Sequence, residues 1–138
     1  MAAVAELKPE IREMFEKANY GHLATLTADG SPASVALWVG MEGDRIVFFT
    51  QEGSAKARNL ARDPRVAISM IDRDNPYRTA RVRGRVVATR EGDAALEVID
   101  RIARKFTGED FPMRDGLVYE VEPEHVGYME LPFEEKAG

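Results

Sequence analysis

Residues 21–50 read GHLATLTADGSPASVALWVGMEGDRIVFFT, and this stretch decides the fold class. It holds three runs rich in apolar and β-branched residues, at 22–27, 34–41 and 45–50. The pairs Asp29-Gly30 and Gly43-Asp44 separate these runs. Such residues favour tight hairpin turns because they accept positive φ at little cost. We therefore predict an antiparallel meander of three strands.

The flanking sequence adds helices and further strands. Residues 8–18 predict a helix, because Pro9 suits a first turn and apolar residues recur at helical spacing. Similar patterns predict helices at 54–62 and 92–106 and strands at 65–71, 77–90 and 117–122, the last continuing over 124–129 after Pro123.

Six antiparallel strands in so short a chain require closure, because an open sheet would leave exposed edges. The expected fold is therefore mainly β: a six-stranded antiparallel Greek-key split β-barrel with peripheral helices. We expect one domain over residues 1–138, with a core over about 8–130 and a polar, frayed tail at 130–138.

Composition excludes several classes of function. The chain has 138 residues, a net charge of −5 and no cysteine, which speaks against a nucleic-acid partner and excludes disulfides and thiolate chemistry. His22 and His125 have no carboxylates at ligand spacing, so no metal site is expected. No run approaches the roughly 18 apolar residues of a membrane span, and the start of the chain lacks a signal-peptide pattern. We expect a soluble, cytoplasmic protein with no membrane partner.

A candidate anion site lies at residues 50–59, TQEGSAKARN. A strand end, a glycine turn and a helix start meet here, and the free N–H groups of a helix start attract anions. Ser54 can cap the helix or bind a phosphate oxygen. Lys56 opposes the helix dipole, which a bound anion explains better than helix stability. The alternative is a plain capped helix with exposed Lys56 and Arg58.

Strand alternation over 77–90 defines an arginine stripe, Arg81, Arg83 and Arg85. The stripe is either a solvated face paired with acidic neighbours or an anion groove. Gly84, on the opposite face, indicates a bulge or a close backbone approach. Trp38, the only tryptophan, is typical of a core or an interface, and it can also flank a planar ring. With Val39 it indicates an apolar interface between subunits.

Three segments carry a resemblance to a known family: 21–39 (GHLATLTADGSPASVALWV), 45–72 (RIVFFTQEGSAKARNLARDPRVAISMID) and 75–87 (NPYRTARVRGRVV). They resemble the pyridoxamine-phosphate-oxidase-like split β-barrel superfamily. The segments IDRIARKFTGEDFPMR and VYEVEPEHVGYME, at 99–114 and 118–130, are similar to its branch of F420-dependent oxidoreductases. The pattern S-x-K-x-R-N-L-x-x-D-P-R-V-A at 54–67 is the most specific part.

The resemblance implies a homodimer with two equivalent sites at the subunit interface. It puts the cofactor phosphate at Thr50, Gln51, Ser54, Lys56 and Arg58. It puts the flavin or deazaflavin ring along Val35, Ala36, Leu37 and Trp38, and it has the partner subunit contribute Asn75, Tyr77 and Arg78.

The function implied by the resemblance is hydride transfer between coenzyme F420 and a small conjugated organic substrate. The alternatives are an FMN-dependent oxidoreductase of the same fold and a flavin- or deazaflavin-binding protein without turnover. The arginine stripe favours F420, because the oligoglutamate tail of this cofactor is polyanionic. Pyridoxamine-phosphate oxidases carry a longer C-terminal segment for their substrate, so vitamin B6 oxidation is not expected. No catalytic residue is assigned, because the cofactor carries the reactive carbon.

Overall fold

The computed structural model describes residues 4–133, which form three helices and six strands. In chain order these are α1 (Pro9–Glu16), β1 (Tyr20–Leu26), β2 (Pro32–Glu42), β3 (Arg45–Gln51), α2 (Ala55–Arg62), β4 (Arg65–Asp72), β5 (Asn75–Arg90), α3 (Gly92–Thr107) and β6 (Gly116–Glu130). None of these helices is long and apolar enough to cross a membrane. Most of the tail expected to be frayed, residues 134–138, lies outside the described residues.

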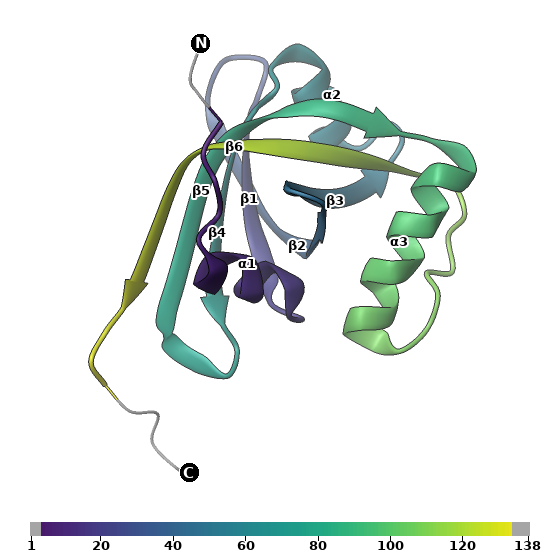
Figure 1. The fold of residues 1–138 in the computed structure, drawn as a ribbon. Helices are drawn as coiled ribbons and strands as arrows, with labels where there is room; N and C mark the ends of the chain where they lie inside the picture. Colours follow the sequence, from purple (N-terminus) through teal and green to yellow (C-terminus); the bar gives the residue numbers. More distant parts are fainter. Residues whose placement is uncertain (1–3, 134–138) are drawn as a thin grey trace.

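The six strands form a closed antiparallel barrel in the order β1-β2-β3-β6-β5-β4, which confirms the predicted fold class. β1 closes the barrel on β4 through the pairs from Gly21↔Met70 to Ala24↔Ala67. Figure 1 shows α3 standing beside the barrel, with α1 toward the lower end of the view and α2 at the top. The long strands β5 and β6 run down one side of the barrel, and β4 pairs with the lower part of β5.

The predicted meander is present, but its second hairpin opens. β1 pairs with β2 from Leu26↔Pro32 to Tyr20↔Trp38, and Gly30 in the intervening turn has a φ of 84°. β2 pairs with β3 only from Glu42↔Arg45 to Val39↔Phe48. Beyond this point β2 pairs with β1 alone, and residues 49–51 of β3 pair with β6. The pairing of β2 with β3 therefore ends at Val39↔Phe48, and the strands separate from Trp38 and Phe49 onward. We call this opening the split.

Gly84 is the point at which β5 and β6 touch most closely, as its sequence context predicts. A bulge falls between Arg83 and Gly84, and a Cβ on Gly84 would lie 2.2 Å from the carbonyl oxygen of Glu122. Pro123 pairs with Gly84 here, and its missing N–H is accommodated where the ladder is already irregular. β6 therefore runs without a break from Gly116 to Glu130.

Two apolar clusters make up the core. The first fills the barrel and is closed by Ile11, Met14 and Phe15 of α1. The second lies between α3 and the outer side of β3 and β6, around Val47 and Val118. Val39 belongs to the first cluster and is fully buried. The expectation that Val39 forms a subunit interface is therefore wrong, because its side chain faces the interior of its own barrel.

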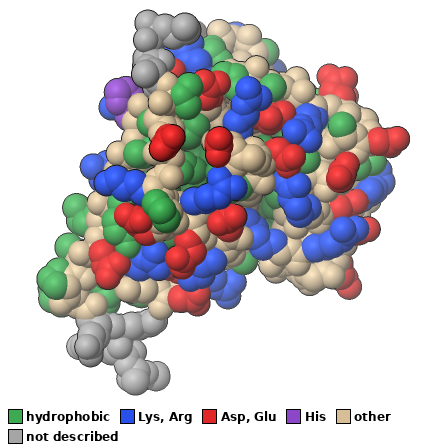
Figure 2. Space-filling model, in the orientation of Figure 1, with side chains coloured by type: hydrophobic (Ala, Val, Ile, Leu, Met, Phe, Trp, Pro, Cys, Tyr) green, Lys and Arg blue, Asp and Glu red, His purple; other side chains and the backbone are tan. Residues whose placement is uncertain are grey.

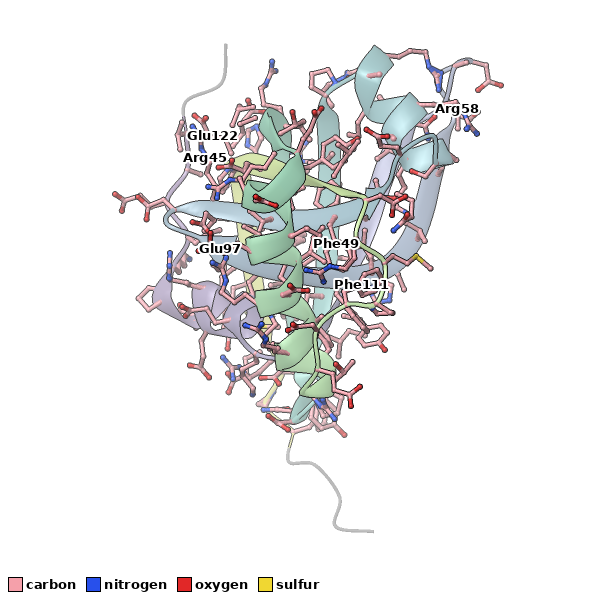
Figure 3. All side chains as sticks on the ribbon, turned by 90° about the vertical axis from the view of Figure 1, so that its right-hand side faces the viewer. Arg45, Phe49, Arg58, Glu97, Phe111 and Glu122 are labelled. Carbon is pink, nitrogen blue, oxygen red and sulfur yellow. The ribbon has the colours of Figure 1, made fainter. Side chains whose placement is uncertain are left out.

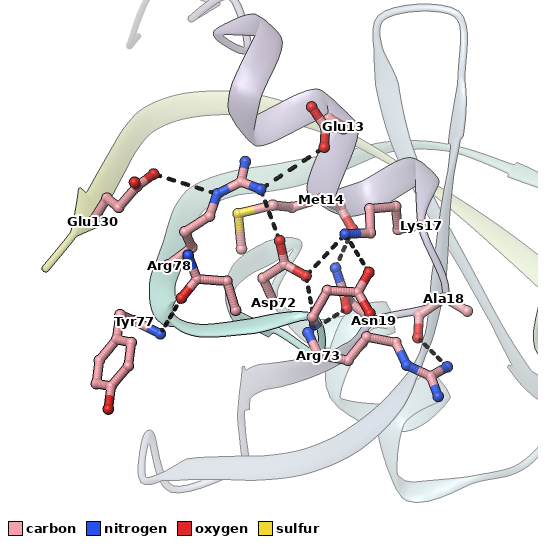
Figure 4. A network of polar contacts seen from close by, with 12 residues as sticks. Glu13, Met14, Lys17, Ala18, Asn19, Asp72, Arg73, Tyr77, Arg78 and Glu130 are labelled. Atoms are coloured by element: carbon pink, nitrogen blue, oxygen red, sulfur yellow. Dashed lines mark hydrogen bonds and ion pairs between the residues drawn. The ribbon is translucent and has the colours of Figure 1, made fainter. Parts of the chain in front are cut away.

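A buried carboxylate ties α1 to the hairpin between β4 and β5 (Figure 4). Asp72 is fully buried, and it accepts hydrogen bonds from Lys17 (3.1 Å) and Arg78 (2.9 Å). Lys17 also pairs with Asp74 at 2.6 Å, and these two carboxylates raise the pKa of its ammonium group. Asn19 donates to the carbonyl of Met14 and accepts from the backbone of the hairpin. This network fixes one end of the barrel.

Candidate functional site

The start of α2 has the strand end, glycine turn and capped first turn that the sequence predicts, a geometry common to an anion site and to a plain capped helix. Ser54 is the N-cap, and its hydroxyl accepts a hydrogen bond from the N–H of Ala57 at 3.1 Å. The buried Thr50, near the end of β3, holds the same hydroxyl at 3.0 Å. Lys56 lies in the first turn, half-buried, and no acidic residue shares that turn. Lys56 makes no ion pair with the carboxylates of residues 4–133, so its charge is available to an anion.

The other two residues predicted for the phosphate have more local contacts. Gln51 is the last residue of β3 and pairs with Gly116 of β6. Arg58 is exposed and donates to the carbonyl of Gly53, so it turns back on the glycine turn. Figure 3 places Arg58 at the edge of the molecule, well away from Phe49 and Phe111.

A small cavity of about 200 Å³ opens at the split. It is lined by Tyr20, Ala36, Leu37, Trp38, Phe49 and Phe111. Three of the four residues predicted to flank the cofactor ring therefore meet here, and Val35 lies outside this lining. Phe49 directly precedes Thr50, so β3 connects the cavity to the start of α2.

The aromatic wall of this cavity is the part that sequence reasoning missed. Trp38 stacks on Phe106 of α3, with ring centroids 5.1 Å apart and planes 7° apart. Phe111 meets Phe49 edge to face at 5.0 Å and Trp38 at 6.1 Å. Phe106 and Phe111 lie about 70 residues from Trp38 in the chain, and no local pattern indicates that they meet it. Together they form an apolar, aromatic surface against which a planar ring can pack.

Asp100 holds the loop that carries Phe111. Its carboxylate accepts two hydrogen bonds from the guanidinium of Arg114, at 2.8 and 2.9 Å, and one from the N–H of Phe111 at 3.1 Å. The bonds from Arg114 are the main reason that the pKa of Asp100 lies below its usual value. This paired carboxylate anchors residues 108–115 to α3 and sets the position of the Phe111 ring.

The arginine stripe points outward, while Ala80 and Val82 on the alternate face of β5 are buried, as predicted. Arg85 is paired with Glu124 at 2.9 Å, as expected of a solvated, ion-paired face. Arg81 and Arg83 have no carboxylate within 4 Å in the described part of the chain. The guanidinium of Arg81 lies against Gly127, where a Cβ would come within 2.6 Å of it. The outcome is mixed, with two of the three arginines available to an anion.

An outer cleft of about 420 Å³ runs over β1, β4, β5 and β6 beside the stripe. It is lined by the side chains of Arg81, Arg83, His22 and His125 among others, so the two histidines share one surface although they are far apart in sequence. Elsewhere charges are more often paired, as between Glu120 and Arg45, and Figure 2 shows acidic and basic side chains interspersed on the face in view.

The residues expected from a partner subunit lie at the other end of the barrel from α2 (Figure 1). Asn75 and Tyr77 begin β5, and the ring of Tyr77 lies 5.4 Å from that of Phe133. Arg78 is engaged by Asp72 and by the hydroxyl of Tyr128, at 2.9 Å each. A single chain therefore does not bring these residues to the phosphate position.

The fold and these positions define a split barrel with an available cation at a helix start and an aromatic cavity beside it. The chain belongs to the pyridoxamine 5'-phosphate oxidase family, whose profile matches residues 7–130, and this confirms the resemblance.

Solved structures agree with this assignment. The chain is similar to an F420 reductase, with 28% identity, a TM-score of 0.77 and coverage of 88% of this chain and 98% of that one. It is also similar to a conserved hypothetical protein from Mycobacterium tuberculosis (23% identity, TM-score 0.76, 100% and 96% covered). A putative pyridoxamine 5'-phosphate oxidase from Listeria innocua shares the fold (21% identity, TM-score 0.66, 86% and 94% covered).

Replacing Asp100 by Asn should destabilise the protein near neutral pH by about 1–2 kcal/mol, the scale of lost charge-assisted hydrogen bonds. Because the folded pKa of Asp100 is depressed, its stabilisation is present above about pH 4 and is lost as the pH falls through the folded value. Urea unfolding of both proteins near pH 7 and near pH 3 should show a smaller difference at acid pH. The exposed Asp110→Asn, which breaks a pair with Arg104, is the control and should cost less. An equal difference at both pH values would contradict the assigned role.

Proposed function

We propose that this protein is an oxidoreductase that transfers a hydride between coenzyme F420 and a small conjugated organic substrate. One observation carries the proposal: Phe49 of the aromatic cavity is followed in β3 by Thr50, whose hydroxyl contacts the N-cap Ser54 of α2, and the available cation Lys56 lies in the first turn of that helix. A cofactor with a phosphate and a planar ring needs these two features side by side. The similarity to an F420 reductase over 88% of the chain supports the choice of deazaflavin.

The residues fit such a group by their chemistry. Lys56 and the free backbone N–H groups of the first turn of α2 would hold the phosphate, with the hydroxyls of Ser54 and Thr50 beside them. Gln51 and Arg58 would complete this side of the site. The cofactor, when bound, supplies the hydride chemistry. The chain would orient the ring along Val35, Ala36, Leu37 and Trp38, and its aromatic wall would exclude water.

The same proposal includes a homodimer. Asn75 and Tyr77 lie at the far end of the barrel from α2, so they would reach a phosphate site only on a second chain. Arg78 would support these two residues and would not contact the phosphate itself, since its guanidinium is held by Asp72. A second copy of the chain would cover the outer face of the sheet, where small side chains allow close contact. These small residues are Ala24, Ser34, Ala36, Ala67, Ser69 and Gly127.

Light scattering at micromolar concentration should therefore give a mass twice the 15.4 kDa of the chain. The small residues of the outer face let two sheets approach closely, and burial of the exposed Val35 would stabilise the contact. A mass of one chain would overturn the shared site.

FMN is the second candidate cofactor, and the structure offers a specific reason to keep it. Arg85 is already paired with Glu124, so the stripe presents two available cations rather than three to an anionic tail. Parallel titrations with F420 and FMN, followed by the fluorescence of the single Trp38, decide between them. Tight binding of either without turnover of any conjugated substrate would instead indicate a binding protein.

Replacing Lys56 by Ala should weaken cofactor binding by roughly 1.5–3 kcal/mol, the scale of a hydrogen bond to a charged group. The fold should survive, because the ammonium has no partner in the described structure. Titration and thermal melting are the measurements, and Arg62→Ala, which removes a cation from the other end of α2, is the control. Unchanged affinity and melting temperature would mean that α2 is only a capped helix.

Replacing Arg81, Arg83 and Arg85 together by Gln should lower F420 affinity several-fold and flatten its salt dependence. Exposed pairs contribute about 0.2–1 kcal/mol each and are screened by salt. FMN affinity should hardly change, because FMN lacks the tail. The single Arg85→Gln should have little effect, since Arg85 is already paired. If the triple variant binds F420 as tightly as the parent at low salt, the stripe is a solvated face.

A further inference from the structure

A second, larger cavity of about 610 Å³ adjoins the one at the split, and the proposed cofactor site does not use it. It lies between the ends of β1, β2 and β4 and the last turn of α3. Its lining comprises Ala18, Asn19, Tyr20, His22, Trp38, Ile71, Arg73, Phe106 and Thr107. Trp38 and Tyr20 line both cavities, so the two spaces share one wall.

Three aromatic rings, of Tyr20, Trp38 and Phe106, form one part of the lining of this cavity, beside the polar Asn19, His22 and Thr107. Trp38 and Phe106 are stacked in nearly parallel planes, and Tyr20 meets Phe106 edge to face at 5.6 Å. Tyr20 is 54% exposed and Ile71 is 52% exposed, so the molecule leaves large apolar side chains in water at this place. Exposed apolar surface gathered around a cavity marks a binding site, and stacked aromatic walls select a planar ring.

The rim of the cavity carries a cation without an acidic partner. Arg73 is exposed, and the guanidinium contacts only the carbonyl of Ala18, at 3.5 Å. Its neighbours Asp72 and Asp74 are instead engaged by Lys17 and Arg78 (Figure 4). No carboxylate of residues 4–133 lies within 4 Å of the Arg73 guanidinium. The backbone N–H of Arg73 is fixed by Asn19 at 2.9 Å, so this cation is attached to an ordered part of the chain.

We propose that this cavity binds a planar aromatic anion, with its ring against Tyr20 and Trp38 and its carboxylate or phenolate oxygen at Arg73. The apolar walls supply stacking, and the guanidinium supplies a charge-assisted hydrogen bond that selects acids over neutral rings. Trp38 lines both cavities, so the anion binds beside the cofactor-ring position and not in the direct contact that hydride transfer requires. The anion site therefore does not rest on the proposed function.

Calorimetric titration of the cofactor-free protein with 2-naphthoate tests the site directly. The parent protein should bind 2-naphthoate more tightly than the neutral 2-naphthalenemethanol. Arg73→Gln should weaken 2-naphthoate binding roughly tenfold and leave the alcohol unaffected, because only the acid uses the charge. Arg73→Lys should retain part of the preference for the acid. Arg65→Gln, an exposed cation of β4 outside the cavity lining, is the matched control and should bind both probes like the parent.

Tyr20→Ala should weaken both probes alike, because it removes a stacking wall rather than the charge. If the parent does not bind 2-naphthoate, or if Arg73→Gln binds it as tightly as the parent, the aromatic-anion site is overturned. Binding of F420 or FMN in that same preparation would leave the proposed function standing. Conversely, 2-naphthoate binding by a protein that binds neither cofactor would support this cavity and overturn the proposed function.

Discussion

Closure of the sheet between β1 and β4 is the constraint on which the rest of the structure depends. Closure places β1 between β2 and β4, and Gly21 has no room for a side chain there, since a Cβ would lie 2.8 Å from Val39 of β2 and 3.3 Å from Ile68 of β4. It also curls β5 and β6, with the Gly84 bulge at their closest approach. A six-stranded barrel of this size is filled by its own side chains, such as Leu23, Phe48 and Ile68. Any ligand must therefore bind outside the barrel, at the split or on the outer face.

The helices and hairpins then fix the edges of those outer surfaces. Asp72 is a buried carboxylate, which is costly unless it is paired, and the two cations of Lys17 and Arg78 offset that cost. The result is a β4–β5 hairpin with a defined position, which sets where Arg73 lies. Asp100 and Arg114 do the same for the loop after α3, and so for Phe111. Both ion pairs are structural, and both act on the walls of the candidate cavities.

The split exposes the side chains that form the candidate cofactor site. Because the pairing of β2 with β3 ends at Val39↔Phe48, the next residues beyond this pair, Trp38 and Phe49, are not paired with each other across the opening. Trp38 and Phe49 face this opening, and α3 covers them with Phe106. β3 continues from Phe49 through Thr50 to the cap of α2, so an apolar surface passes into a cationic helix start within a few residues. An apolar surface followed by a cationic helix start suits a ligand that is flat at one end and anionic at the other.

The sequence by itself determined the strands, the helices and most of the barrel, because turn residues, strand alternation and helical spacing are local signals. It also placed Lys56 in the first turn of α2, and its family motif put Ser54 and Lys56 in one site. Only the tertiary structure decided that Val39 is core, that Arg85 is paired while Arg81 is available, and that Phe106 and Phe111 meet Trp38. Those outcomes depend on which residues, distant in the chain, come to lie together when the sheet closes. No periodicity within a segment records that contact.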